Sequence, residues 1–529
     1  MSVDVLLFTG MSGYSSNIND FGDDPVYETR TRSSGTYRIA TYLRKEFEFD
    51  VEVIDFIFSW TLEELKEVCK SRIGPDTRMV GIGGIFYLHA PVIVKLFAHI
   101  KEEYPHVLTT AGSQTIWSIT QIPNIDYYIS GYGELGLKAV LNGTAKYEMW
   151  QDRVKHVDCW RTPEYAAYPW PILTILYEDR DYVLPHETLS METSRGCKFK
   201  CSYCNYPVLG VKGDYTRSAA DFEYNMKVNY DRWGITEYII TDDTFNDHIE
   251  KIRKYGDVVE SLDFTPNFGG YIRADLMTQR PHDVEELARM RFNSHMYGIE
   301  STNHASAKSI GKGAKATNIL PAILEAKKYI QKNNGFYRGE MSFIYGLPHE
   351  TQETLDYTFK WIDENWQNES VSMFPLMIMR DTGLIHPNEM THNLDKYGYT
   401  VMQQIEAQPI GNRLDHIYDN PNIHQYFKDR IRKQLPDPMG PEFQYATYLW
   451  RNEFTNYMEA FIKVQESLWG HERYWDRAVP IFGQANWNNV GFTKTDMQKS
   501  FRDLPSMMNP PEEMVRASIE DYKKKKLSL

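Results

Sequence analysis

Eight residues contain three of the chain's five cysteines: Cys197, Cys201 and Cys204. The spacing is CxxxCxxC, and Tyr203 stands directly before the last thiol. Thiolates this close together are typical ligands of iron–sulfur clusters, and four of them complete an electron-transfer [4Fe–4S] cube. A set of three leaves one iron open to bind and reduce a ligand. The motif therefore indicates chemistry at a cluster rather than storage of electrons.

Zinc binding and disulfide formation fit this cysteine pattern less well. Structural zinc takes four ligands, usually from two separated pairs, and no cysteine follows Cys204. A disulfide framework belongs to secreted chains, whereas no apolar leader follows Met1 here. We therefore expect a cytoplasmic protein in which Cys69 and Cys159 are buried, inert thiols.

Length and composition predict a protein of two or three domains without a membrane span. The chain has 529 residues, of which 42% are hydrophobic and 25% charged, the proportions of a soluble globular protein. No apolar run approaches the length that crosses a bilayer. The net charge of −14 argues against a broad nucleic-acid-binding face, because phosphate binding needs basic surface.

Residues 1–145 alternate between short apolar runs and stretches of helical periodicity, which predicts a Rossmann-like, doubly wound parallel sheet. The runs expected to form strands are 3–9, 51–56, 79–84, 107–110 and 126–130. Ligands of such sheets bind at the carboxyl ends of the strands. The small residues at those ends are Gly10, Gly84, Gly112, Ser113 and Gly131.

The rest of the chain divides into three parts. Prolines break any long helix in 146–185, which we expect to be a linker. In 186–385, six apolar strands separated by helical stretches predict a (β/α)6 partial barrel, whose chemistry sits at the carboxyl ends of its strands. Residues 386–529 are expected to be a mostly helical, aromatic-rich extension.

The cysteine loop resembles the signature of the radical S-adenosylmethionine (SAM) superfamily, and the segments GIES (298–301) and GLPHET (346–351) resemble its SAM-binding strand ends. The resemblance implies an open iron that chelates the amino and carboxylate groups of SAM. Reductive cleavage would then give methionine and a 5′-deoxyadenosyl radical, which abstracts hydrogen from an unactivated carbon. A flavodoxin-like or ferredoxin-like donor would supply the electron.

The same resemblance implies contacts with SAM for six residues and leaves the catalytic residues unknown. It places Tyr203 and Gly346 beside the adenine, Glu300 and Ser301 on the ribose, Arg273 on the SAM carboxylate and Asp242 near the SAM amino group. Two alternatives with a purely structural role stay open. Asp242 could instead cap the next helix, and Glu300 could form a salt bridge at the barrel mouth.

The first domain resembles the cobalamin-binding domain that precedes many radical SAM cores, through its segments TTAGSQ (109–114) and YYISGYGE (127–134). The glycines and Ser113 at its strand ends would then hold a corrin ring. The chain departs from the DxHxxG pattern, which supplies a histidine to cobalt, because Thr9-Gly10-Met11-Ser12-Gly13 stands there. Some relatives hold cobalamin without a protein ligand.

These observations predict a cobalamin-dependent radical SAM methyltransferase with one cluster and an unknown substrate. A cobalamin-free radical SAM enzyme that catalyses a rearrangement or oxidation is the alternative, and a non-catalytic iron–sulfur redox sensor is the second. Two features of the extension have no family parallel. Residues 445–464 are expected to form an aromatic helix in the core, at a domain interface or as a substrate lid. Lys523–Lys526 is expected to be a solvated tail, or a dock for an acidic electron donor.

Overall fold

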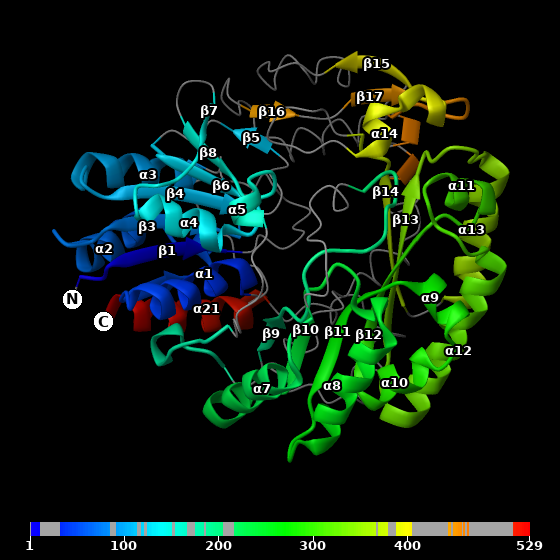
Figure 1. Ribbon diagram of the computed structural model, residues 1–529, viewed down its shortest axis with the longest axis horizontal. Coiled ribbons are helices and arrows are strands. Elements are labelled where there is room, and N and C mark those ends of the chain that lie inside the picture. Colours follow the sequence, from blue (N-terminus) through cyan, green and yellow to red (C-terminus); the bar gives the residue numbers. More distant parts are fainter. Residues whose placement is uncertain are drawn as a thin grey trace.

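The computed structural model contains two mainly parallel α/β sheets that lie side by side (Figure 1). The residues that the structure describes are 2–10, 32–84, 91–113, 118–120, 124–150, 154–166, 175–184, 187–204, 216–366, 369–378, 388–404, 443–445, 448–457, 459–460, 463–464 and 512–528. None of the helices in these ranges is long and apolar enough to cross a membrane.

Within the described ranges, the first sheet has seven strands in the order β2-β1-β3-β4-β6-β8-β7. Neighbours are parallel, except that β7 runs antiparallel to β8. The strands are β1 Val5–Thr9, β2 Val51–Ile54, β3 Met79–Gly83, β4 Leu108–Ser113, β6 Tyr127–Ser130, β7 Glu148–Trp150 and β8 Val154–Asp158. The helices are α1 Ser34–Phe47, α2 Leu62–Arg72, α3 Pro91–Glu103, α4 Gly133–Leu141 and α5 Pro163–Ala166. The expected doubly wound α/β fold is confirmed.

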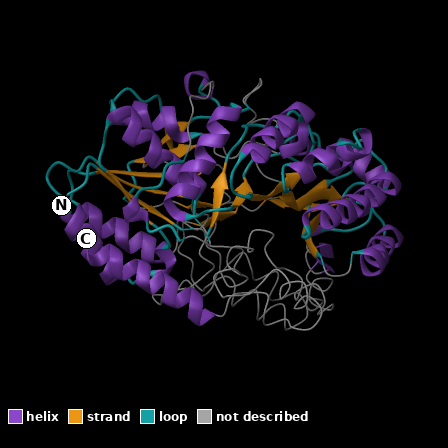
Figure 2. Cartoon of the chain, turned by 90° about the horizontal axis from the view of Figure 1, so that it is seen from below, coloured by secondary structure: helices purple, strands orange, loops and turns teal. Residues whose placement is uncertain are grey.

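Strand β1 explains why this sheet is covered on both faces. Its five residues are all buried, and side chains alternate between the faces of a strand. Val5 and Leu7 belong to the core formed with α1 and α4, whereas Leu6 and Phe8 belong to the core formed with α2 and α3. Figure 2 shows helices on both sides of the strand layer.

In the order β2-β1-β3-β4-β6, the chain first adds a strand on one side of β1 and then continues on the other side, from β3 to β6. This is the flavodoxin-like order, in which the strand connections diverge between β1 and β3 and leave a crevice outside the carboxyl ends of these two strands. The topology therefore places a ligand site beside Thr9 and Gly83, the last residues of the two strands.

The second sheet, within the described residues, has six strands that follow chain order from β9 to β14. All five neighbouring pairs are parallel. The strands are β9 Thr188–Met191, β10 Glu237–Ile240, β11 Asn267–Ile272, β12 Phe292–Glu300, β13 Arg338–Tyr345 and β14 Ser370–Pro375. The helices are α7 Ala219–Trp233, α8 Ile249–Ser261, α9 Ala274–Gln279, α10 Asp283–Arg289, α11 His304–Ser309, α12 Ala316–Asn334 and α13 Gln352–Asn365.

The first sheet continues past residue 145, into the segment that we expected to be a linker. Strands β7 (148–150) and β8 (154–158) extend the sheet beyond β6. The pattern VKHVD hides its strand character because a histidine interrupts the apolar residues. His156 is nevertheless buried, and its Nε2 lies 2.8 Å from Ser130 Oγ of the neighbouring strand. Ser130, 26 residues away, thus provides a hydrogen-bond partner for the buried imidazole ring.

The C-terminal extension contains strands where we expected an aromatic helix. Strand β17 (Tyr448–Arg451) pairs with β15 (Thr400–Gln404), and β16 (Phe443–Tyr445) pairs with β5 (Ser118–Thr120). The helix that we expected over 445–464 is therefore wrong at 445 and at 448–451, which belong to strands. Strand β17 (YLWR) buries Trp450 in the core that contains the second sheet. The remaining short elements are α14 Glu389–His392 and 3-10 helices at Ile57–Ser59, Asp179–Asp181, Phe245–Asp247 and Leu394–Tyr397.

The chain ends in α21 (Glu512–Ser528), which packs on the first domain beside α2, with the two termini close together (Figures 1 and 2). The solvated lysine tail is thereby contradicted at two of its four positions. Lys523 Nζ lies 2.9 Å from Glu64 Oε2, and Lys526 Nζ lies 3.1 Å from Glu52 Oε1, with both lysines buried. Sequence could not reveal these carboxylates because they are more than 450 residues away.

Tyr522 should be the main apolar anchor of α21, because its side chain is fully buried beside Phe56 and Trp60. Replacing it with alanine should cost about 3–5 kcal/mol of folding free energy, as for other buried aromatics, and lower the thermal midpoint measured by circular dichroism. The control is alanine at exposed Lys524, which should change stability by less than about 0.5 kcal/mol. A Tyr522→Ala variant as stable as wild type would contradict this packing.

Candidate functional site

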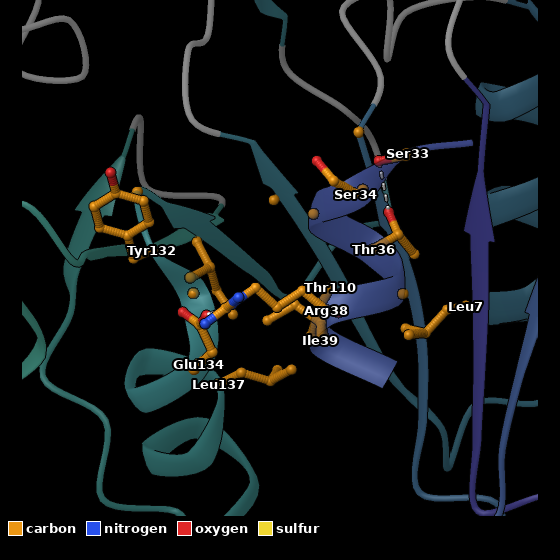
Figure 3. A pocket seen from close by; sticks show the side chains of 18 of the residues that line it. Leu7, Ser33, Ser34, Thr36, Arg38, Ile39, Thr110, Tyr132, Glu134 and Leu137 are labelled. Atoms are coloured by element: carbon orange, nitrogen blue, oxygen red, sulfur yellow. Dashed lines mark hydrogen bonds and ion pairs between the residues drawn. The ribbon is translucent and has the colours of Figure 1, made fainter. Parts of the chain in front are cut away.

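A cavity of about 400 Å³ lies at the carboxyl ends of β1, β3, β4 and β6. Its walls include the first turn of α1, the start of α4 and apolar side chains such as Leu7 and Leu137 (Figure 3). The far wall consists of residues that follow strands β9 and β10 of the second sheet: Glu192, Ser194, Arg195, Thr241 and Asp243. The cavity thus joins the ligand-binding edge of the first sheet to the residues that precede the cysteine loop.

Three of the glycines singled out from the sequence line this cavity: Gly84, Gly112 and Gly131. Each also packs closely against its protein neighbours. A Cβ on Gly84, where φ is +69°, would lie 1.9 Å from Ser33 Oγ, and a Cβ on Gly112 would lie 3.1 Å from Ile129 O. On Gly131, where φ is +94°, it would lie 2.9 Å from the Trp160 ring. Close packing therefore suffices to explain why these residues are small.

The other two predicted residues of the first domain differ from this group. Gly10 packs against Ile57, whose backbone nitrogen would be 3.0 Å from an added Cβ, and Gly10 does not line the cavity. Ser113 ends β4, but its side chain lies outside the described part of the structure. Sequence reasoning missed Gly35, which lines the cavity and whose added Cβ would meet no atom within 4 Å.

Four alternating charges cross from the first domain to the second at the cavity wall. Arg38 Nε lies 2.8 Å and Arg195 Nη2 2.5 Å from Glu134 Oε1. Glu192 receives the other ends of the same guanidinium groups, 3.0 Å from Arg38 Nη1 and 2.7 Å from Arg195 Nε. Burial opposes the charge on Glu134, but Arg195 and Arg38 outweigh it and lower the pKa of Glu134 to about 2. We call these four residues the interdomain ion cluster.

Asp242 anchors the start of the cysteine loop from the end of β10. Its carboxylate accepts hydrogen bonds from the backbone nitrogens of Thr193, at 2.7 Å, and Ser194, at 3.0 Å. The hydroxyls of both residues donate to Oδ2, and Lys251 Nζ lies 3.4 Å from the same oxygen. The position of Asp242 near the SAM amino group stays a prediction.

The three thiols of the motif lie in residues 192–204, which follow β9 and contain no helix or strand. Cys201 is buried, and Arg273 Nη1 donates to its sulfur at 3.5 Å. Cys197 Sγ lies 3.5 Å from Thr244 Oγ1, and Cys204 N donates to Cys201 O at 3.1 Å. Among the described residues, no three His, Cys, Asp or Glu side chains surround a single point as the ligands of one metal ion do.

Arg273 connects the thiols to the end of β11. Its guanidinium binds Asp275 through both oxygens, at 2.7 and 3.0 Å, and stacks over Phe199 with 3.7 Å to the ring centroid. Arg273 is buried. The sequence motif RAD contained Asp275, but nothing in the pattern indicated that this carboxylate turns back onto the arginine.

Glu300 and Tyr203 meet although 97 residues separate them. Tyr203 Oη donates to Glu300 Oε1 at 2.7 Å, and Lys312 Nζ lies 3.2 Å from the same oxygen. Glu300 is buried and adopts φ +64°, a left-handed conformation that is strained for a side chain of this kind. Ser301, also buried, accepts a hydrogen bond from Asn303 N at its hydroxyl, at 3.1 Å. Sequence reasoning missed Lys312.

Gly346 begins the loop after β13, and the C-terminal extension covers it. Its φ is +86°, and an added Cβ would lie 2.3 Å from the Trp450 ring. Its carbonyl accepts hydrogen bonds from Tyr399 Oη, at 2.6 Å, and from Asn452 Nδ2, at 3.0 Å. Glu350 accepts from its nitrogen at 2.6 Å, and burial raises the pKa of Glu350 to about 8.

Comparisons with known proteins agree with this architecture. Residues 191–362 match the Radical SAM superfamily. An uncharacterised methyltransferase of Pyrococcus horikoshii is 22% identical over 353 residues, which cover 62% of this chain and 72% of the relative.

Two solved enzymes share the fold over nearly the whole chain. The radical SAM methyltransferase TsrM from Kitasatospora setae, solved with tryptophan and a SAM analogue, gives a TM-score of 0.57 at 13% identity, covering 98% of this chain and 99% of TsrM. The cobalamin-dependent radical SAM enzyme OxsB gives 0.56 at 15% identity, covering 98% and 72%. Residues 191–362 are therefore a radical SAM domain, and nearly the whole chain has the fold that TsrM and OxsB share.

Proposed function

We propose that this enzyme is a cobalamin-dependent methyltransferase that acts on an unactivated carbon, with one [4Fe–4S] cluster held by Cys197, Cys201 and Cys204. One observation carries the proposal: the cavity at the carboxyl ends of the first sheet has Ser194 and Arg195 in its wall, two to three residues before the first thiol. A ligand of the first domain would therefore lie next to the cluster loop. When bound, the reduced cluster supplies the electron that cleaves SAM, and cobalamin supplies the transferable methyl group.

The chemistry of the thiol loop fits a cluster. Three sulfurs leave one iron of a cube for SAM, and hydrogen bonds to sulfur together with burial tune the potential of such a centre. Cys201 is buried and accepts from the Arg273 guanidinium. Asp242 keeps the entry to the loop in one conformation through two backbone bonds. An external flavodoxin-like or ferredoxin-like protein would deliver the electron.

We assign SAM to the polar side chains around the same loop. Glu300 would accept the ribose hydroxyls, since a carboxylate takes two such bonds, while Tyr203 and Lys312 hold it in place. Arg273 would face the SAM carboxylate, and Ser301 and Gly346 the nucleoside. Asp242 would act by positioning Thr193 and Ser194 rather than by touching SAM.

The cavity also suits a large, mainly apolar ring at the flavodoxin-like crevice. Leu7, Ile39, Ile129 and Leu137 line it. The described lining contains no histidine, in keeping with the missing DxHxxG motif, so a bound corrin would receive no imidazole from these residues. TsrM and OxsB, which share the fold, have been solved with cobalamin and with aqua-cobalamin bound.

One observation favours the cobalamin-free alternative. The glycines at the strand ends pack closely against Ser33, Ile129 and Trp160. A first domain that only supports the fold and binds no cobalamin would therefore also favour glycine at these positions. The cavity can be tested separately from these glycines through Gly35, where a side chain would enter open space.

Replacing Cys197, Cys201 and Cys204 with alanine should remove the brown chromophore and the roughly four irons per chain expected of one cube. The matched control replaces Cys69 and Cys159, both buried; burial raises the pKa of Cys69 to about 12 and that of Cys159 above its usual range. Iron analysis of anaerobically purified protein makes the comparison. Iron retained without the triplet would remove the basis of the proposal.

Glu300→Gln should weaken SAM binding about tenfold to a hundredfold, because a hydrogen bond to a charged group contributes roughly 1.5–3 kcal/mol. Anaerobic titration calorimetry measures the affinity, and iron content should stay at the wild-type value. Exposed Glu325→Gln is the control and should bind SAM normally. The dithionite-reduced wild type should release 5′-deoxyadenosine; a loaded cluster that never does so would favour the redox sensor.

Gly35→Trp should block cobalamin by filling the cavity, whereas Gly35→Ala should not, since a methyl group there meets no atom within 4 Å. Anaerobic loading of wild type and the alanine variant should give about one cobalt per chain and a base-off visible spectrum, with much less cobalt in the tryptophan variant. Iron should be equal in all three. Cobalt absent from wild type under every loading condition would transfer the assignment to the cobalamin-free enzyme.

A further inference from the structure

We infer that Arg195 is a positioning residue that ties the cysteine loop to the wall of the first-domain cavity and so sets the separation of the two cofactors. The inference rests on the proposed function for the identity of those cofactors. The tie itself stands on the described contacts alone.

Arg195 is the point at which both domains meet the cysteine loop. It precedes Cys197 by two residues and binds Glu134, the second residue of α4 in the first domain, across a sequence separation of 61. Its Nε also binds Glu192 at 2.7 Å. Arg38 of α1 contacts the same two carboxylates and so completes the interdomain ion cluster.

This arrangement uses the shape of arginine as well as its charge. The planar guanidinium offers donors to two carboxylates at once, which a lysine ammonium cannot match in geometry. It also lies 4.0 Å from the centroid of the Tyr132 ring, within the range of a cation–π contact. Figure 3 shows Arg38 and Glu134 directed toward one another at the cavity wall, with Tyr132 above them.

The burial of these charges favours a role in geometry over a role in stability. The four side chains are at most 14% exposed, and desolvation offsets much of the attraction in a buried ion pair. Apolar residues could join the domains equally firmly, whereas oriented ion pairs specify one arrangement. Asp242 holds residues 193–194 from the second sheet, and Arg195 holds the next residue from the first domain. The loop entry is therefore fixed from both sides.

The test uses the full-length protein with its cluster and cobalamin loaded, and compares wild type, Arg195→Lys and Arg195→Met. Pulsed electron paramagnetic resonance of the reduced cluster and cob(II)alamin reports the spin–spin coupling, which depends on their separation. A single defined coupling is expected in wild type, and a broadened or weakened one in both variants, at unchanged iron and cobalt content. Lysine should not rescue the coupling, because it keeps the charge but loses the two-carboxylate geometry.

Hydrogen exchange of the iron-loaded protein without cobalamin gives a second readout. Residues 192–204 should exchange about tenfold faster in Arg195→Met, the size expected for loss of one charge-assisted contact. Arg72→Met is the matched control, since Arg72 forms a similar buried pair with Glu52, 2.6 Å apart and away from the cavity. If Arg195→Met fails to fold, the nearly isosteric Glu134→Gln takes its place.

Wild-type coupling and exchange in a folded Arg195→Met variant would overturn the inference, as would full rescue of both by lysine. A wild type that binds no cobalt would instead contradict the proposed function, and the exchange experiment would still decide whether Arg195 positions the loop. The two failures are therefore distinguishable.

Discussion

The carboxylate of Asp242 is the contact on which the arrangement of the cysteine loop depends. It sits at the carboxyl end of β10, is buried, and accepts hydrogen bonds from two consecutive backbone amides at the start of the loop. A buried carboxylate must have its oxygens satisfied, and these amides do so only if residues 193–194 adopt one conformation. Arg195 and the first thiol, Cys197, follow this fixed segment within three residues.

Distant parts of the chain complete the surroundings of that loop. Arg195 reaches α4 of the first domain, Arg273 reaches a sulfur from β11, and Glu300 reaches Tyr203 from β12. The parallel sheets bring these groups together because the carboxyl ends of parallel strands share one edge. The C-terminal extension adds a cover at Gly346 through Trp450.

Much of the fold was predictable from local pattern. Apolar runs separated by helical periodicity indicated both sheets. Of the seven described strands of the first sheet, four lie within the expected runs, and β4 overlaps its run but extends three residues beyond it. The failures share one cause. Strand β8 contains a buried histidine, the aromatic segment around Trp450 is a strand, and two of the four lysines near the end of α21, Lys523 and Lys526, are buried. In each case a partner elsewhere in the chain outweighed the local preference of the residues.

The sequence by itself determined which residues could do chemistry: three thiols at cluster spacing, and polar or small residues after successive strands. Tertiary structure alone decided what those residues contact. Asp242 binds the cysteine loop, Gly84 makes room for Ser33, and Arg195 joins two domains. Spacing along a strand or loop is a local property that the backbone preserves on folding. A hydrogen bond between residues 49 or 61 positions apart depends on how the sheets pack together, which no local pattern records.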